Sequence, residues 1–189
     1  MRVPSIATVA AITLLSACDA VTAPGLLAAA ALDPLETPPQ QLALAVSLPE
    51  SVRLRDGDAI LHLSYSDGTD PMVSETVPLT ITPITGLELA SGDHAYRAAL
   101  VADDARRFAA AQRAIKELRS DGVEGTGSFG LSVVGGCTTA PLPDALPVAT
   151  WLQPGPEAAF VPLTRRANAY DGLGPDEAAT LRAAIGPCP

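Results

Sequence analysis

Aromatic residues, lysine and histidine are all scarce in this chain of 189 residues. Aromatic residues make up 4% of the sequence, Lys116 is the single lysine, and there are two histidines. The 12 basic residues form no run longer than two, and 21 acidic residues bring the formal net charge to −9. Proteins that bind nucleic acid need clustered Lys and Arg, so this balance argues against a nucleic-acid partner.

Charged residues and long hydrophobic runs are also limited. Charged residues are 17% of the chain and hydrophobic residues are 48%, which excludes a wholly disordered protein and leaves enough apolar material for one core. The apolar stretch from Ile6 to Leu15 would span about 15 Å as a helix, roughly half of a hydrocarbon core. This stretch is therefore too short for a transmembrane helix.

The first 18 residues have the order of a secretory signal. Met1 and Arg2 give a positive start, Ile6 to Leu15 give the apolar region, and Leu15-Ser16-Ala17-Cys18 follows. That tetrapeptide resembles the lipobox of bacterial lipoproteins. The resemblance implies that residues 1–17 are a signal peptide and that Cys18 is acylated. The alternative is an ordinary signal peptide in which Cys18 is incidental.

A lipid on Cys18 would be the means of attachment to the membrane. Removal of residues 1–17 takes away Arg2 and no acid, so the net charge of the mature chain becomes −10. Anionic headgroups repel such a body, so acyl chains rather than charge must hold it. Asp19 resembles a signal that retains some enteric lipoproteins, which favours the periplasmic face of the inner membrane over the outer membrane. The alternative is that Asp19 is simply an acidic residue of a linker.

Composition divides the remainder into a tether and a domain. Residues 18–40 are rich in Ala and Pro and predict a tether, which as a flexible coil would span roughly 25 Å. Residues 41–189 predict a single periplasmic β-rich domain. Period-two alternation predicts strands over 42–48, 59–66 and 76–82, and further strands are expected over 96–101, 129–133, 148–152 and 160–163. Pro78 and Pro83 make the 76–82 strand an edge strand.

Two helices interrupt this pattern. Apolar residues at steps of three and four from Phe108 to Leu118 predict a helix over about 103–120. Pro175, followed by two acidic residues, predicts a short helix over about 175–185. The expected fold is therefore mainly β, an antiparallel sandwich or partial barrel with one mid-chain and one C-terminal helix.

Cysteine use fits an oxidising compartment. With Cys18 lipidated, Cys137 and Cys188 remain as an even pair, and they are expected to form a disulfide. A reactive thiol is the rival interpretation, but Cys137 has no neighbouring His or Lys in the sequence to stabilise a thiolate.

Motifs for chemistry are weak. Gly125 to Gly130 match G-x-G-x-x-G, but they follow a helix and open a strand, the reverse of a dinucleotide site. His94 lies near Ser91 and Asp93, and His62 lies on the polar side of its strand. Neither arrangement is a catalytic triad by sequence. Two Asp-Gly turns, at Asp56-Gly57-Asp58 and Asp67-Gly68-Thr69-Asp70, lie too far apart along a strand to share one Ca²⁺.

No motif therefore predicts a cofactor, a metal site or an enzyme. Trp151 is either a core residue or an exposed anchor, and Arg165-Arg166 either meet an acidic partner or flank a strand end. The sequence favours a non-enzymatic binding or envelope-assembly accessory held at the membrane through Cys18. One alternative is a pilotin-like or chaperone lipoprotein that captures an envelope protein by strand addition at an open sheet edge. Another is a hydrolase whose site involves His62 or His94.

Overall fold

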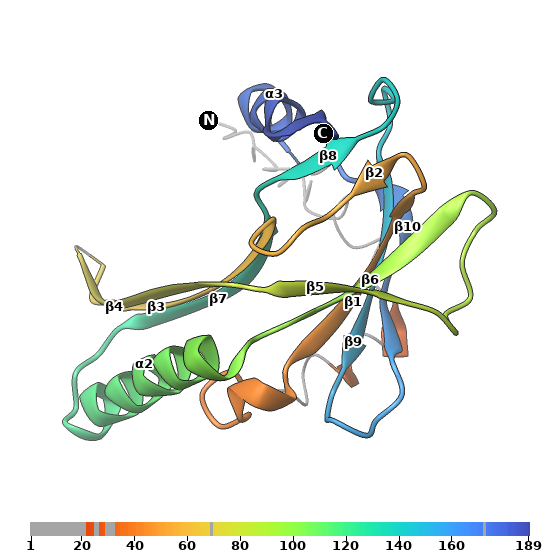
Figure 1. Cartoon of the computed structure of the whole chain (residues 1–189). Coiled ribbons are helices and arrows are strands. Elements are labelled where there is room, and N and C mark those ends of the chain that lie inside the picture. The colour runs from red at the N-terminus through yellow and green to blue at the C-terminus, as the bar shows by residue number, and fades with distance from the viewer. Residues whose placement is uncertain (1–21, 25–26, 29–32, 69, 172) are drawn as a thin grey trace, which may run out of the picture.

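The computed structural model describes residues 22–24, 27–28, 33–68, 70–171 and 173–189. They form a mainly β protein with one long mid-chain helix and one shorter C-terminal helix, as the sequence predicts (Figure 1). The elements are η1 (Pro39–Gln41), β1 (Ala43–Pro49), β2 (Val52–Arg53), β3 (Ala59–Ser66), β4 (Pro71–Pro78), β5 (Thr80–Ile84), β6 (Asp93–Ala99), α2 (Ala102–Ser120), β7 (Thr126–Val133), β8 (Gly136–Thr138), β9 (Pro147–Gln153), β10 (Val161–Asn168), α3 (Pro175–Ala184) and β11 (Ile185–Pro187).

The largest sheet has five antiparallel strands in the order β10-β9-β1-β6-β5. Its central strand β1 has the predicted alternation. The small residues Ala43 and Ala45 are buried on one face, at 2% and 0% exposure. Leu44 on the other face is only half-buried, so this face is incompletely covered within the described chain.

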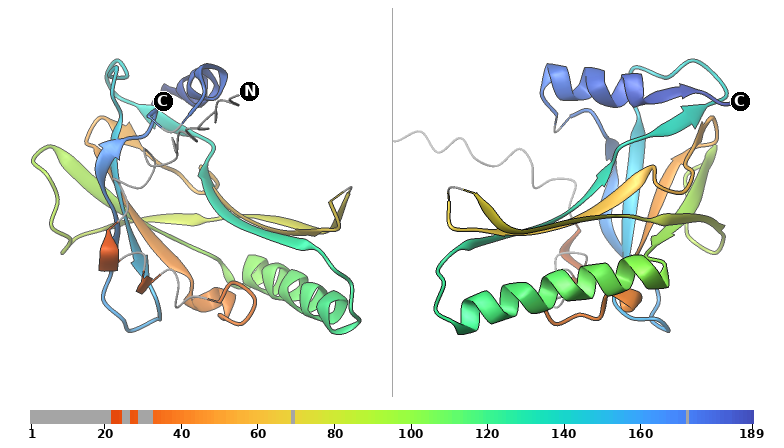
Figure 2. Two further views of the ribbon diagram at one scale, coloured as in Figure 1. Left: turned by 180° about the vertical axis from the view of Figure 1, so that it is seen from behind. Right: turned by 60° about the vertical axis from the view of Figure 1, so that its left-hand side comes forward.

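The second sheet has the order β4-β3-β7 and packs against α2 (Figure 2). Leu61, Leu63 and Tyr65 of β3 point to the helix side and are almost fully buried. They meet Phe108 and Ile115 of α2, the same apolar face that the sequence pattern indicates. This contact is the main core of the protein.

One segment of chain serves as an edge of both sheets. The sequence predicts a single edge strand over 76–82, but the structure has β4 and β5 with a break at Leu79. The Leu79 N–H donates to the Ala59 carbonyl at 2.9 Å, and its own carbonyl accepts from Gly57 N–H at 3.0 Å. Both strands are edges, as the prolines predict.

A third, small sheet has the order β11-β8-β2 and lies beside α3. Its strands are only two or three residues long, which is too short for hydrophobic periodicity in the sequence to predict them. The disulfide between Cys137 and Cys188 joins β8 to the end of the chain, with a Cα–Cα distance of 4.8 Å. The pairing expected from the two remaining cysteines is therefore present.

Part of the segment expected as a free tether packs on the domain. Gln112, which is 5% exposed on α2, donates from Nε2 to the carbonyls of Pro34 and Thr37 at 2.8 and 3.0 Å. Leu35 packs against the main core, and Glu36 pairs with Lys116 at 3.2 Å. Residues 33–41 are therefore fixed to α2.

Candidate functional site

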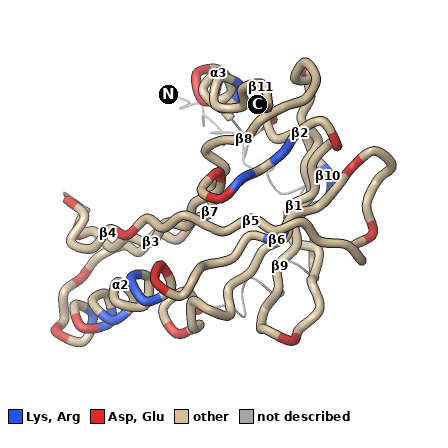
Figure 3. Tube along the Cα trace, viewed as in Figure 1, with Lys and Arg blue, Asp and Glu red and all other residues tan. Residues whose placement is uncertain are grey.

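Strand β7 is the outer strand of the β4-β3-β7 sheet, and its far side pairs with no strand in the described part of the chain. It is exposed along nearly its whole length. It contains no proline and no charged residue, and the tube of β7 is accordingly tan in Figure 3. Natural proteins usually protect a long open edge with charges, prolines or bulges, because the free backbone groups invite another strand. β7 has none of these protections.

The hydrogen-bond pattern shows which backbone groups of β7 are free. Leu79 N–H donates to the Ala59 carbonyl. The backbone N–H and C=O groups of the odd-numbered β3 residues therefore point toward β4, and those of the even-numbered residues point toward β7. Val134 N–H donates to the Asp58 carbonyl at 2.8 Å, so the backbone N–H and C=O groups of the even-numbered β7 residues are the ones that bond to β3. The backbone N–H and C=O groups turned toward the open edge therefore belong to four residues: Gly127, Phe129, Leu131 and Val133.

The same four residues face the interior side of the sheet. They lie opposite Tyr65, Leu63, Leu61 and Ala59, all of which are buried. Phe129 makes an edge-to-face contact with Phe108 of α2, with ring centroids 6.3 Å apart. Even so, Phe129, Leu131 and Val133 remain 41%, 38% and 38% exposed. The open edge thus has an apolar inner face.

Three hollows follow one another along β7. The first, of about 240 Å³, lies between Gly127–Phe129, the α2 residues Ile115 and Arg119, and the N-terminal residues 33–35. The second, of about 280 Å³, lies between Phe129–Leu131 and the half-covered face of the large sheet, at Leu44, Leu152 and Leu163. The third, of about 410 Å³, lies between Val133–Val134 and α3. We call this series the β7 groove.

Charges lie only at the two ends of the β7 groove. Arg119 lines the first hollow together with Asp33, and it lies over the Tyr65 ring at 5.9 Å. Asp176 and Glu177 line the third hollow. The lining of the central hollow is uncharged. The groove therefore suits an extended apolar segment whose end at α3 carries a positive charge.

The residues singled out in the sequence lie elsewhere. Cys18, Asp19 and the rest of the tetrapeptide that resembles a lipobox lie outside the described residues. No described helix has the length and apolar character needed to cross a membrane. Cys137 and Cys188 form the disulfide and close the small sheet.

The histidines have structural partners. His62 Nδ1 lies 3.1 Å from Thr76 Oγ1 on the outer face, and His94 Nε2 donates to the Val52 carbonyl at 2.7 Å. Asp93 is instead held by Arg166 at 2.8 and 3.1 Å, and this hydrogen bond raises the pKa of Arg166. The structure therefore does not assemble Ser91, Asp93 and His94 into a triad.

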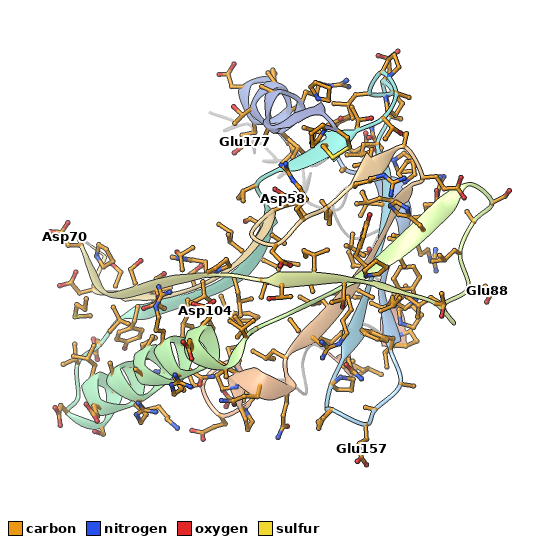
Figure 4. All side chains as sticks on the ribbon, viewed as in Figure 1. Asp58, Asp70, Glu88, Asp104, Glu157 and Glu177 are labelled. Atoms are coloured by element: carbon orange, nitrogen blue, oxygen red, sulfur yellow. A yellow bond between two sulfur atoms is a disulfide. The ribbon has the colours of Figure 1, made fainter. Side chains whose placement is uncertain are left out.

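The two acidic turns lie at opposite ends of β3, and Figure 4 shows Asp58 and Asp70 far apart. Asp56 accepts from Ile81 N–H at 2.7 Å, and Asp58 accepts from Arg55 N–H at 2.8 Å. Asp67-Gly68 begins the turn between β3 and β4. The described residues contain no group of three or more His, Cys, Asp or Glu side chains placed to hold a metal.

Gly125, the first glycine of the G-x-G-x-x-G match, has a packing role that a substitution can test. A Cβ on Gly125 would lie 2.7 Å from the Ser66 carbonyl, whereas a Cβ on Gly130 would meet no atom within 4 Å. We expect Gly125→Ala to lower the free energy of unfolding by about 1–3 kcal/mol, because the backbone must move. Gly130→Ala is the control and should be nearly neutral in the same urea titration. Equal effects of the two variants would contradict this role.

Trp151 of β9 lies opposite Ala45 of β1, on the buried alanine face of the large sheet. Trp151 is 8% exposed and packs with Ala45 and Ala149, so it is a core residue. Arg166 forms an ion pair with Asp93 of the same chain, at 2.8 Å.

Sequence reasoning identified β7 as a strand but not as a site. The available signal was eight successive residues, Thr126–Val133, with neither charge nor proline. That signal indicates an unprotected edge only once the strand order is known. No protein-family model, no curated protein and no solved structure matches this chain.

Proposed function

We propose that this chain is a lipid-anchored periplasmic protein of the cell envelope that captures an extended segment of an envelope partner at β7. Acylated Cys18 holds it on the bilayer, and no catalytic step is involved. The observation that carries the proposal is the open, uncharged edge of β7 with apolar hollows along it. Strand addition uses both features, because backbone hydrogen bonds supply affinity and pockets for alternate side chains supply specificity.

The geometry defines the segment. A strand placed beside β7 directs alternate side chains to the inner face, next to Phe129, Leu131 and Val133. Those side chains fill the hollow against Leu44 and Leu152 and must be apolar. The intervening side chains lie on the outer face, beside Ser128, Gly130 and Ser132, and are polar.

Charge adds a direction to the segment. Asp176 and Glu177 line the hollow at the α3 end of the groove, so a Lys or Arg at that end of the segment is favoured. The mature chain carries a net charge of −10, which also favours a basic partner over an acidic one.

Site-specific crosslinking in intact cells tests the capture. A photoreactive amino acid at Leu131 should crosslink to a segment of alternating apolar and polar residues in one envelope protein. The matched control is the same amino acid at Met72, which is 37% exposed at the tip of β4, on the opposite edge. Equal crosslinking at both positions, or crosslinking to a second copy of this chain, would overturn the proposal.

Amide hydrogen exchange with a synthetic peptide of the crosslinked segment gives a finer test. The amides of Gly127, Phe129, Leu131 and Val133 should exchange quickly in the free protein and become protected with peptide. The amides of Ser128, Gly130 and Ser132 already bond to β3 and should change little. A ligand that only covers the surface would not produce this alternation.

Proline substitutions separate binding from folding. Leu131→Pro removes an N–H group that faces the open edge, so the fold should persist while peptide affinity falls about tenfold. Gly130→Pro removes an N–H group that bonds to β3 and should destabilise the sheet instead. Calorimetric titration measures the affinity, and unaltered affinity of Leu131→Pro would contradict strand addition.

A further inference from the structure

The N-terminal segment is attached to β10 as well as to α2. Thr22 N–H donates to the Leu163 carbonyl at 3.0 Å, and the Thr22 hydroxyl donates to the Pro162 carbonyl. Figure 2 shows this first described segment against β10, at the side of the large sheet. The segment therefore contacts the domain only four residues after Cys18.

The contact shortens the connection between the lipid and the domain. Four extended residues span about 14 Å at most, whereas the 14 residues that precede the fixed segment at Asp33 would span about 50 Å at most. A lipid anchor on Cys18 would therefore attach to the chain no more than about 14 Å from the β10 edge. It can hold the domain against the membrane surface in one orientation.

The surface beside Thr22 is suited to a bilayer. Thr22 borders a hollow of about 360 Å³ that the half-buried Leu89 lines, together with Ala149 and Trp151, which are themselves only 7% and 8% exposed. The charged residues that line it are Glu88, Asp93, Arg165 and Arg166, so its net charge is zero. The chain as a whole is strongly acidic, so this neutral area can approach anionic headgroups when most of the surface is repelled.

Leu27 supplies a second apolar group on the same segment. It is 73% exposed, more than any other large hydrophobic residue described. An apolar side chain exposed this far in water is favoured at a membrane interface, because burial removes its apolar area from water.

We propose that the domain docks on the lipid surface through β10, the hollow at Trp151, and the described residues Thr22 and Leu27. The inference rests on the acylated Cys18 of the proposed function. In this orientation the tip of β4 points away from the bilayer, since it lies on the far side of the molecule from β10 (Figure 4, Asp70).

The single tryptophan of the chain allows a direct test. The full mature lipoprotein is reconstituted into vesicles of phosphatidylcholine and phosphatidylglycerol that contain a lipid with a spin label on its headgroup. Trp151 emission should be strongly quenched. In a Trp151→Phe chain with Met72→Trp, the new tryptophan lies at the β4 tip and should be quenched at least twofold less.

The Thr22 contact is tested with a matched pair. Thr22→Pro removes both the N–H and the hydroxyl donor, whereas Thr22→Ser keeps both. Quenching of Trp151 should fall by about half in Thr22→Pro, because the greatest reach of the connection grows from about 14 Å to about 50 Å. Thr22→Ser should behave like the parent chain.

Co-sedimentation with the vesicles distinguishes the ways of failing. If the protein sediments with vesicles but the two tryptophan positions are quenched equally, docking is overturned and the anchor stands. If the full chain does not sediment with vesicles, both the anchor and the docking are overturned.

Discussion

Cys18→Ala should transfer the protein from the membrane fraction to the soluble periplasmic fraction. Each buried CH₂ of an acyl chain contributes about 0.8 kcal/mol, so two or more chains hold a protein stably, and their loss leaves no comparable attachment. The remaining chain is acidic, with 21 acidic residues against 11 basic ones after loss of Arg2, so headgroup charge does not substitute for the lipid. Immunoblots of fractionated cells measure the distribution.

Ser16→Ala provides the matched control for this experiment. It keeps a small residue at that position of the lipobox, so it should leave the protein membrane-bound. A Cys18→Ala protein that still sediments with membranes after a high-salt wash would refute the lipid anchor. Mass spectrometry of the parent chain should show the acylated cysteine as its N-terminal residue.

Loss of the disulfide should be the most damaging change to the stability of the domain. Cys137 and Cys188 are 51 residues apart, and in the chain-entropy model a loop of that size contributes about 4 kcal/mol. The bond holds β8 beside β11, and α3 has no fully buried residue, although Arg182 donates to the carbonyls of Pro143 and Asp144. For a domain of this size the loss corresponds to a fall in Tm of roughly 12 °C.

Thermal unfolding in the soluble Cys18→Ala background measures this effect. The double variant Cys137→Ala/Cys188→Ala should match the parent chain treated with reductant, since both lack the same bond. Reductant should leave the double variant unchanged. A parent chain whose Tm does not respond to reductant would show that the disulfide adds no stability.

The periodicity of hydrophobic residues predicted those strands and helices whose structure depends mainly on residues close in sequence. The alternation around Leu44 and around Leu61 predicts β1 and β3, because one or both faces of these strands are buried. The three-and-four spacing from Phe108 to Leu118 predicts α2 for the same reason. The expected strand over 96–101 is displaced. β6 begins at Asp93, where its pairing with Pro49 of β1 starts, and it ends at Ala99.

Long-range contacts determined what the sequence could not predict. β2, β8 and β11 exist only through their mutual pairing and the disulfide. Residues 33–41 have the composition of a linker, yet the amide of Gln112 and the core contact of Leu35 hold them. The β7 groove forms because α2, α3 and the large sheet all lie close to β7. The local sequence of β7 contains no signal that predicts these long-range contacts.

The break at Leu79 has a mechanical consequence for the whole molecule. Because the chain passes without a loop from the edge of one sheet to the edge of the other, neither sheet can peel away without pulling on its neighbour. The backbone bonds of Leu79 to Ala59 and Gly57 are the junction through which that tension is transmitted. We therefore expect the two sheets to unfold as one cooperative unit.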